Sequence, residues 1–242
     1  MTRERHRYGR ARSQFGELTC PDGDGPHPVA VLIHGGYWKA QYSRKLMRPL
    51  SADLVARGWA TWNLEYRRLG QGSGGGWPAT LDDVHRGIDH LAGVEAPLDL
   101  GRVVAIGHSA GGHLAAWAAV RGPCAVPVTA VVAQAGVVDL ELAWELHLSK
   151  GVVARLLGGT PEEVPERYAH ASPAARLPLG VPVLVTHGGR DDSVPPHMSE
   201  GFARRAAAAG DDCELVLLED EDHFGHLDPA NPLWRAVIEW IR

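Results

Sequence analysis

The stretch VVAIGHSAGGHLAA, residues 103–116, decides the fold of this chain. It opens with an apolar run typical of a strand that is buried on both faces, and it closes with residues that favour a helix. Between the two lies GHSAG, residues 107–111, which fits G-x-S-x-G. In that motif small neighbours allow a sharp turn from strand to helix, with the serine at its tip. A glycine-rich helix start without chemistry is the alternative, but the strand before and the helix after favour Ser109 as a nucleophile.

Outward from this stretch, short apolar runs alternate with longer helical patterns. We predict strands over residues 29–33, 60–64, 103–106, 128–133, 181–186 and 214–218, with an earlier edge strand over 13–19. We predict helices over residues 43–57, 79–93, 110–121, 196–209 and 232–241. This alternation predicts an α/β fold, in which a mostly parallel, doubly wound sheet carries helices on both faces.

Residues 139–179 interrupt the alternation, because this whole segment contains no predicted strand. A helix is predicted over 140–148, and Thr160 is the expected N-cap of another, since a proline and then a glutamate follow it. We expect a small helical cap over the sheet, within a single domain that spans residues 1–242. The glycine-rich run over 70–76 predicts a flexible loop at the rim of the site.

The composition is that of a globular chain without a nucleic-acid partner. Of the 242 residues, 45% are apolar and 22% are charged, and the formal net charge is −5, whereas nucleic-acid-binding proteins usually carry a basic excess. The charged N-terminus has no apolar segment after it, and the longest apolar stretch, 126–140, is too short to cross a bilayer. We therefore expect a cytoplasmic protein without membrane association, as a monomer or homodimer.

The sequence offers no evident cofactor or metal site. Its cysteines, Cys20, Cys124 and Cys213, are widely spaced and odd in number, which argues against a disulfide framework and a structural zinc site. The run over 70–76 lacks the G-x-x-x-x-G-K-[ST] pattern of a phosphate-binding loop.

A serine nucleophile needs a base and an acid, which in this kind of fold follow it along the chain as acid and then histidine. The run HGGRDDSVP, residues 187–195, comes after a strand, and its G-x-x-D-x-x-V-P spacing selects Asp191, with Asp192 as the alternative. After the last strand, EDEDHFGH over 219–226 offers His223 and His226. We favour His223, which lies five residues beyond the strand. Metal binding by this His-x-x-His pair is the less favoured alternative.

The run HGGYW, residues 34–38, comes directly off the first strong strand. Two glycines allow the backbone to approach a substrate carbonyl, so that N–H groups point at the oxygen that becomes negative. We predict Gly35 and Gly36 as donors of this oxyanion hole, together with Ala110, the residue after the nucleophile. We expect His34 to be structural and to bond the loop backbone.

Aromatic side chains next to these elements are candidates for substrate contact. Tyr37 and Trp38 follow the glycine pair at a strand end and suit a substrate wall, although burial in the core is their alternative role. In the predicted cap, Trp144, Leu146 and Leu148 would line the site from above. Such a roof would favour small hydrophobic or aromatic acyl groups.

With these motifs placed, the chain resembles the α/β hydrolases of the esterase/lipase and kynurenine formamidase (arylformamidase) group. The matching motifs are HGGYW (34–38), GHSAGGHLAA (107–116), HGGRDDSVP (187–195) and DHF (222–224). The resemblance implies a cofactor-free acyl hydrolase that cleaves a small-molecule ester or amide through a Ser-His-Asp triad and an acyl-enzyme. It also implies that the oxyanion donors are Gly35, Gly36 and Ala110.

The resemblance leaves the acyl group open, because the same triad hydrolyses esters, formamides and some peptides. A carboxylesterase is our first expectation. An arylformamidase that acts on N-formylkynurenine is the alternative, since formamidases commonly carry HGG-x-W. A non-catalytic binding protein is the distant alternative. Such proteins typically lose a triad member, whereas this sequence offers a candidate for all three. The region before residue 29 is short, so we expect early edge strands of the full fold to be missing.

Overall fold

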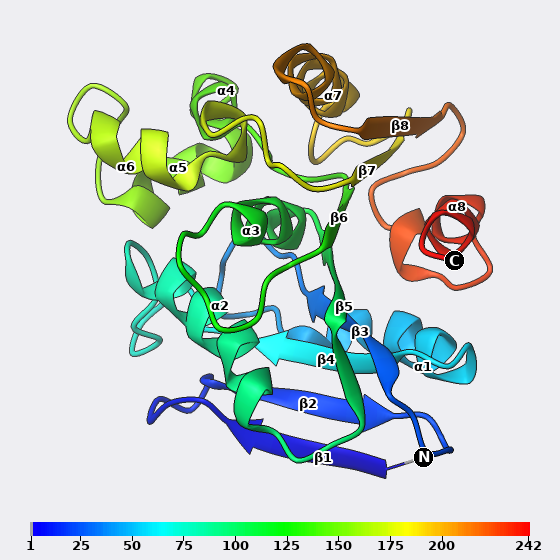
Figure 1. Ribbon diagram of the computed structural model, residues 1–242. Coiled ribbons are helices and arrows are strands. Elements are labelled where there is room, and N and C mark those ends of the chain that lie inside the picture. The colour runs from blue at the N-terminus through cyan, green and yellow to red at the C-terminus, as the bar shows by residue number, and fades with distance from the viewer. Residues whose placement is uncertain (1) are drawn as a thin grey trace.

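The computed structural model describes residues 2–242, which fold around one eight-stranded sheet (Figure 1). The strand order is β1-β2-β4-β3-β5-β6-β7-β8. The strands are β1 (Thr2–Arg7), β2 (Phe15–Cys20), β3 (His27–Ile33), β4 (Ala60–Glu65), β5 (Leu98–His108), β6 (Ala130–Gln134), β7 (Val183–Gly188) and β8 (Cys213–Leu218). β1, β2 and β4 pair antiparallel, and β4, β3, β5, β6, β7 and β8 pair parallel in that order. The predicted mostly parallel α/β sheet is confirmed.

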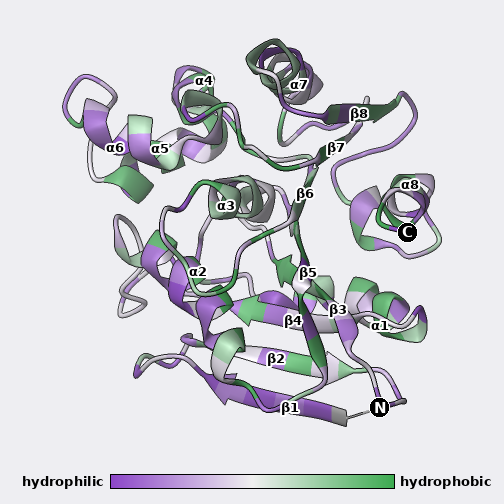
Figure 2. Cartoon of the chain, viewed as in Figure 1, coloured by the Kyte–Doolittle hydropathy of each residue, from purple (hydrophilic) through white to green (hydrophobic). Residues whose placement is uncertain are grey.

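The expectation that early edge strands are missing is wrong. Residues 2–20 form an antiparallel hairpin, β1 and β2, whose second strand joins β4. β1 reads TRERHR and is hydrophilic along its length (Figure 2), so no apolar pattern announces it. A charged outermost strand is a common protection of a sheet edge against pairing with other chains.

Helices cover both faces of the sheet, as predicted. They are α1 (Arg48–Ala56), α2 (Ala79–Asp89), α3 (Ala110–Ala119), α7 (Pro196–Ala209) and α8 (Pro232–Trp240), with short 3-10 turns at Arg44–Met47 and His90–Gly93. Because side chains alternate along a strand, Val31 belongs to the core on the α2 and α3 side, and its neighbour Leu32 belongs to the core on the α1 and α8 side. Figure 1 shows these two layers on opposite sides of the sheet.

The segment 139–179 is helical, as expected, and consists of α4 (Leu140–Glu145), α5 (Leu148–Leu157), α6 (Pro165–Ala171) and a 3-10 turn at Pro173–Ala175. α6 begins at Pro165 instead of near Thr160. Thr160 and Glu163 do exchange the reciprocal bonds of a capping box, from the Thr160 N–H to Glu163 Oε2 (2.9 Å) and from the Glu163 N–H to Thr160 Oγ1 (3.4 Å). The residue before a proline disfavours helical backbone, and Val164 at φ −137° delays the helix to Pro165.

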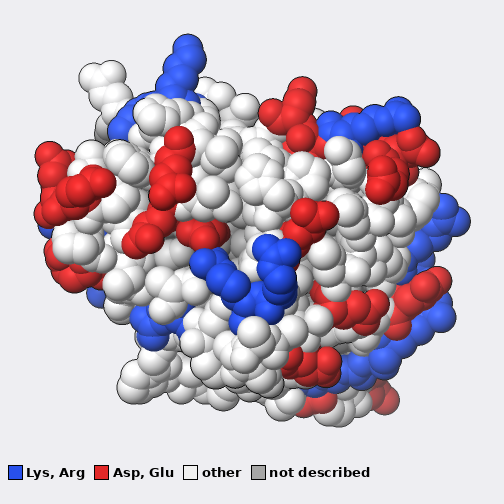
Figure 3. All heavy atoms as spheres, turned by 90° about the horizontal axis from the view of Figure 1, so that it is seen from above, with Lys and Arg blue, Asp and Glu red and all other residues white. Residues whose placement is uncertain are grey.

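Charged side chains of both signs lie on the face of the molecule that is seen from above (Figure 3). Seen from above, acidic and basic side chains interleave over the visible face (Figure 3), so this face carries no extended field of one sign. None of the helices within residues 2–242 combines the length and apolar character that a bilayer crossing requires.

Glycines at the turn between β5 and α3 are required by close backbone approach. A Cβ atom on Gly107 would lie 2.0 Å from the carbonyl oxygen of Gly111, and one on Gly111 would lie 1.9 Å from that of Ile33. Neither backbone oxygen can move without displacing a central strand or the turn itself. The turn therefore lies directly against the end of β3.

We expect Gly111→Ala to lower the free energy of unfolding by about 3 kcal/mol or more, because its methyl group overpacks against backbone. Urea denaturation of purified protein measures this loss. Gly93→Ala is the matched control, since a Cβ there meets open space. Equal stability of the two variants would show that the turn relaxes around the added methyl group.

Candidate active site

Ser109 lies at the tip of the turn between β5 and α3, in a strained backbone conformation. Its φ of 57° and ψ of −120° are rare for a residue with a side chain. The strain is held by hydrogen bonds on both sides, since the Ser109 N–H donates to the Gln134 carbonyl (2.7 Å) and its carbonyl accepts from Gly112 N–H (2.9 Å). The serine thus stands at the N-terminus of α3, whose first N–H groups have no partner within the helix.

Asp191 and His223 meet from two different loops. Asp191 follows β7 and His223 follows β8, and the His223 Nδ1–H donates to Asp191 Oδ2 at 2.6 Å. The other carboxylate oxygen accepts the backbone N–H groups of Ser193 and Val194, at 2.8 Å each. Asp191 is buried, whereas Asp192 is exposed. The spacing that selected Asp191 therefore agrees with the geometry of the loop.

The Asp191 carboxyl is held ionised. Burial would raise its pKa, but hydrogen bonds from His187 and His223 and the nearby His223 charge outweigh burial and hold the pKa well below the usual range. His187 Nε2 lies 3.0 Å from Asp191 Oδ2. The ionised Asp191 carboxylate accepts the Nδ1 proton of His223 and so fixes the tautomer of that ring. Nε2 of His223 is then the nitrogen that is free to act as a base.

His226, the alternative base, lies beneath the site. It is fully buried, and its Nδ1 faces the Thr186 hydroxyl at 3.2 Å. His223 and His226 thus have different partners. Within residues 2–242 no group of three or more His, Cys, Asp or Glu side chains is arranged to hold a metal ion.

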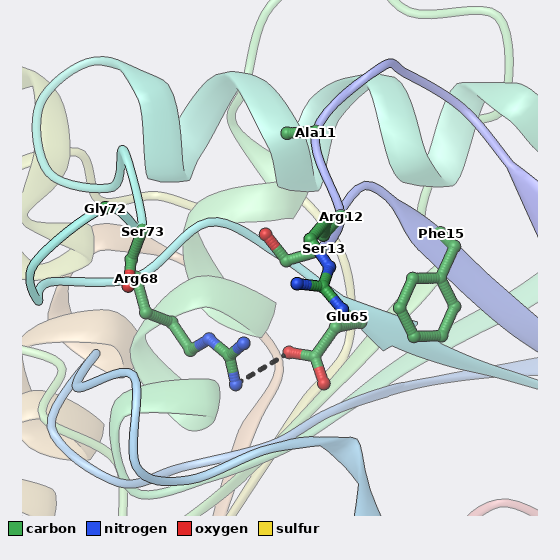
Figure 4. Close-up of a pocket in the computed structure, with 8 residues that line it drawn as sticks. All are labelled: Ala11, Arg12, Ser13, Phe15, Glu65, Arg68, Gly72 and Ser73. Carbon is green, nitrogen blue, oxygen red and sulfur yellow. Dashed lines mark ion pairs between the residues drawn. The ribbon is translucent and has the colours of Figure 1, made fainter.

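A hollow of about 110 Å³ lies over Ser109. Its lining residues come from the HGGYW loop and the segment that follows it as far as the 3-10 turn at Arg44–Met47, from the turn at Ser109, and from the loops that carry Asp191 and His223: Gly36, Tyr37, Tyr42, Leu46, His108, Ser109, Ser193, His223 and Phe224. The predicted nucleophile and base therefore face one cavity. A wider hollow of about 420 Å³ lies elsewhere, between Arg12 and Arg68 (Figure 4), and Ser109 is not part of it.

Sequence reasoning missed two aromatic walls of this hollow, Tyr42 and Phe224. Both are exposed, by 37% and 60% respectively, and with the nucleophile candidate they line one hollow. In the sequence, Phe224 is the last residue of the DHF motif. A signal was available, since an aromatic residue directly after the base in a loop has little reason to be buried.

Tyr37, the predicted substrate wall, lines the hollow, and its hydroxyl donates to the Ser193 carbonyl. Burial, with Asp191 and Asp192 nearby, raises its pKa to about 12, so the hydroxyl keeps its proton. The prediction that Trp38 forms a substrate wall is corrected by the structure. It is fully buried and its ring packs edge-on against His113, with ring centroids 5.2 Å apart, so it belongs to the core and forms no substrate wall.

The predicted roof is also corrected. Trp144 is half-buried and stacks on His147, and no residue of 139–179 is among those that line the hollow over Ser109. The segment packs into the core on the α3 side, and just beyond the HGGYW loop Lys39 Nζ donates to Ser149 Oγ at 2.6 Å. The wall of the hollow is therefore built by the loops after β3, β7 and β8.

The HGGYW loop lies against Ser109. A Cβ on Gly35 would be 2.6 Å from the His108 carbonyl oxygen and 2.9 Å from Ser109 Cβ, so only glycine fits there. Gly36 has a φ of 104° and faces the Tyr42 side chain, where a Cβ would clash at 2.3 Å. Of the three predicted oxyanion donors, Gly36 lines the hollow, Gly35 lies against the turn at Ser109, and Ala110 is the first residue of α3.

Three buried histidines surround the site in their neutral form. Burial lowers the pKa of His108 to about 3, of His113 to about 4, and of His226 well below its ordinary value. His108 Nε2 lies 2.8 Å from the His223 carbonyl and His113 Nε2 lies 2.9 Å from the Ala171 carbonyl. Since a carbonyl only accepts, each of these two rings donates from Nε2.

These pKa values predict a loss of stability in mild acid. In the unfolded chain the same rings bind protons near pH 6.5, so the unfolded state gains protons first as the pH falls. We expect the free energy of unfolding to be highest above pH 6.5 and to fall towards pH 4 by about 1.4 kcal/mol per pH unit for each ring. Urea denaturation at pH 7 and pH 5 measures this, and His113→Gln should flatten the slope. Equal stability at both pH values would contradict the buried neutral state.

Comparison with known proteins shows which family this chain belongs to. The family model named BD-FAE matches residues 18–205, which is most of the chain. The chain belongs to the BD-FAE family. Its match to this family includes the oxyanion loop, the turn at Ser109 and Asp191, and His223 lies beyond the matched residues.

Curated relatives of this BD-FAE family member include two proteins of Mycobacterium tuberculosis. The protein named Esterase LipQ is 30% identical over 200 residues, which cover 76% of this chain and 46% of the relative. The protein named Esterase LipC is 29% identical over 210 residues, which cover 76% and 49%. The chain therefore spans about half the length of these relatives.

Solved structures show the same α/β-hydrolase fold. A truncated carbohydrate esterase from gut microbiota superposes with a TM-score of 0.85 at 21% identity, over 100% of this chain and 95% of that one. The esterase Est2 of Thermogutta terrifontis superposes with a TM-score of 0.78 at 23% identity, over 98% and 89%. At such identities the likeness concerns the fold.

Proposed function

We propose that this BD-FAE family chain is a serine esterase that hydrolyses small carboxylic esters, with Ser109 as nucleophile, His223 as base and Asp191 as the acid that orients it. One observation carries the proposal: a strained serine shares one hollow with a histidine whose far nitrogen is bonded, at 2.6 Å, to an ionised aspartate. Relatives that are named esterases support the same reaction class.

The proposed reaction has two steps. His223 takes the Ser109 hydroxyl proton as the oxygen attacks the ester carbonyl, and backbone N–H groups of Gly35, Gly36 and Ala110 stabilise the tetrahedral oxyanion. The carbonyl re-forms, and the alcohol leaves with the proton from His223. Water then loses a proton to His223 and attacks the acyl-enzyme, and the acid is released with Ser109 restored.

The hollow sets the expected size of the acyl group. About 110 Å³ with walls from Tyr37, Tyr42, Leu46 and Phe224 suits a short apolar acyl chain. Phe224 and Tyr42 are exposed at the mouth, where they can contact the leaving alcohol. We expect kcat/KM to fall for p-nitrophenyl esters longer than butyrate.

The test compares p-nitrophenyl acetate, p-nitrophenyl butyrate, p-nitrophenyl octanoate and N-formylkynurenine as substrates of the same preparation. Ester turnover well above formamide turnover in kcat/KM supports the proposal. The opposite ranking would identify an arylformamidase, which the HGGYW motif left open. Absence of all turnover, with no labelling of Ser109 by a fluorophosphonate, would indicate a non-catalytic binding protein.

A further inference from the structure

His34 opens the HGGYW loop and is enclosed by charged and aromatic partners. It follows β3 directly and is fully buried. Its ring stacks on Tyr66 with centroids 4.5 Å apart and an angle of 15° between the ring planes. The Tyr66 hydroxyl donates to the His34 carbonyl at 2.7 Å. Ring and backbone of this residue are therefore both fixed.

Both ring nitrogens of His34 face groups that accept hydrogen bonds. Nδ1 lies 2.8 Å from the carbonyl oxygen of Gly35, and Nε2 lies 3.0 Å from Glu65 Oε1. A carbonyl oxygen has no proton to give, so Nδ1 must carry one. If Glu65 is ionised, Nε2 must carry one as well.

Several donors keep Glu65 ionised. Burial would raise its pKa, but the hydrogen bond and charge of His34, the Arg68 guanidinium and the Arg44 N–H together lower it. Arg68 lies 3.0 Å from Glu65 Oε1 (Figure 4), and the Arg44 N–H lies 3.2 Å from Oε2. A protonated Glu65 would give up these charge-assisted bonds, which are stronger than bonds between neutral groups.

We propose that His34 is a buried imidazolium, held by Glu65, that positions the oxyanion-hole amide of Gly36. In a trans peptide the C=O of one residue and the N–H of the next point in opposite directions. Since His34 binds the Gly35 carbonyl, the Gly36 N–H is turned away from His34. Gly36 lines the hollow over Ser109, so this orientation aims its amide at the substrate carbonyl. The inference rests on the proposed esterase reaction.

The charges of this group add to the effect of geometry. His34 and Arg68 are positive and Glu65 is negative, so the three side chains together carry one net positive charge beside the oxyanion loop. Solvent screens buried charges weakly. A net positive charge here stabilises an oxyanion more than a neutral ester carbonyl, and it therefore acts on kcat more than on KM.

The first experiment is Glu65→Gln, which keeps an oxygen acceptor and removes the negative charge. We expect kcat for p-nitrophenyl acetate to fall about 10- to 100-fold, somewhat less than for outright loss of an oxyanion donor, with KM changed less than about twofold. Asp83→Asn is the matched control, because Asp83 is also a buried carboxylate paired with an arginine, Arg67, and among the described residues no hydrogen bond or ion pair joins either of them to residues 34–38. The control should lose stability without losing kcat.

The second experiment reads the ring directly and needs no turnover. In ¹⁵N-histidine-labelled protein at pH 8, the His34 ring, assigned by its absence in His34→Gln, should show protons on both nitrogens, and Glu65→Gln should lose one of them. A single protonated nitrogen in the wild type would overturn the imidazolium assignment. Unchanged kcat in Glu65→Gln, with the wild-type spectrum as expected, would overturn the positioning role. If the wild type cleaves no ester, the proposed function fails, while the spectrum still decides the charge of His34.

Discussion

Replacement of Ser109 by alanine is expected to lower kcat for p-nitrophenyl acetate by about 10⁶-fold, the loss that removal of a triad nucleophile typically causes. The alanine leaves the turn without an atom that can form the acyl-enzyme, and its methyl group fits where the serine Cβ already lies. Residual hydrolysis above the rate in water should persist, because the oxyanion amides and the hollow still bind the transition state.

The measurement is steady-state hydrolysis with protein that has been shown by circular dichroism to be folded. KM should change little, since the apolar walls of the hollow remain. Labelling of the wild type, but not of the variant, by a fluorophosphonate identifies the reacting atom. An alanine variant with wild-type kcat would show that the nucleophile lies elsewhere.

Asp191→Asn is expected to lower kcat by about 10⁴-fold, the second-largest effect. The asparagine amide can offer its N–H to Nδ1 of His223, which then keeps its proton on Nε2, the nitrogen that must accept the Ser109 proton. The ionised carboxylate also stabilises the imidazolium that forms during the reaction, and an amide cannot replace that charge.

The control for this variant is the neighbouring aspartate. Asp192 is exposed, and its carboxylate accepts a hydrogen bond from the adjacent Ser193 hydroxyl, at 3.2 Å. Asp192→Asn should keep kcat within about twofold, as is usual for a change at an exposed side chain without a buried partner. A larger loss from Asp192→Asn than from Asp191→Asn would exchange the roles of the two residues.

Local sequence patterns were sufficient to predict the strand, the turn and the helix around Ser109. The run from Val103 to Ala116 predicts strand, turn and helix because each depends on neighbours within a few residues: apolar residues for a buried strand, and small residues where backbones approach closely. Asp191 was distinguishable from Asp192 for a similar reason, since Asp191 accepts hydrogen bonds from N–H groups two and three residues later in its own loop.

Other features depend on partners that are remote along the chain. The charged strand β1 is a strand only because β2 pairs with it, and a propensity count gives no sign of that. Trp38 lies as close to the glycine pair as a substrate wall should, yet it packs against His113 from α3. A periodic pattern shows that an aromatic side chain is near a site, but the surrounding helices decide which way it faces.

The sequence by itself determined the α/β class and the strand that leads to Ser109, and it predicted the proposed order of nucleophile, acid and base, because these follow from hydrophobic period and from glycine positions. Only the tertiary structure decided which loops wall the hollow, that residues 139–179 stay outside it, and that Glu65 meets His34 across 31 residues of chain. The physical reason is the distance along the chain over which each interaction acts. Backbone conformation responds to immediate neighbours, whereas cavity shape and the charge of a buried ring depend on which distant side chains the sheet order brings together.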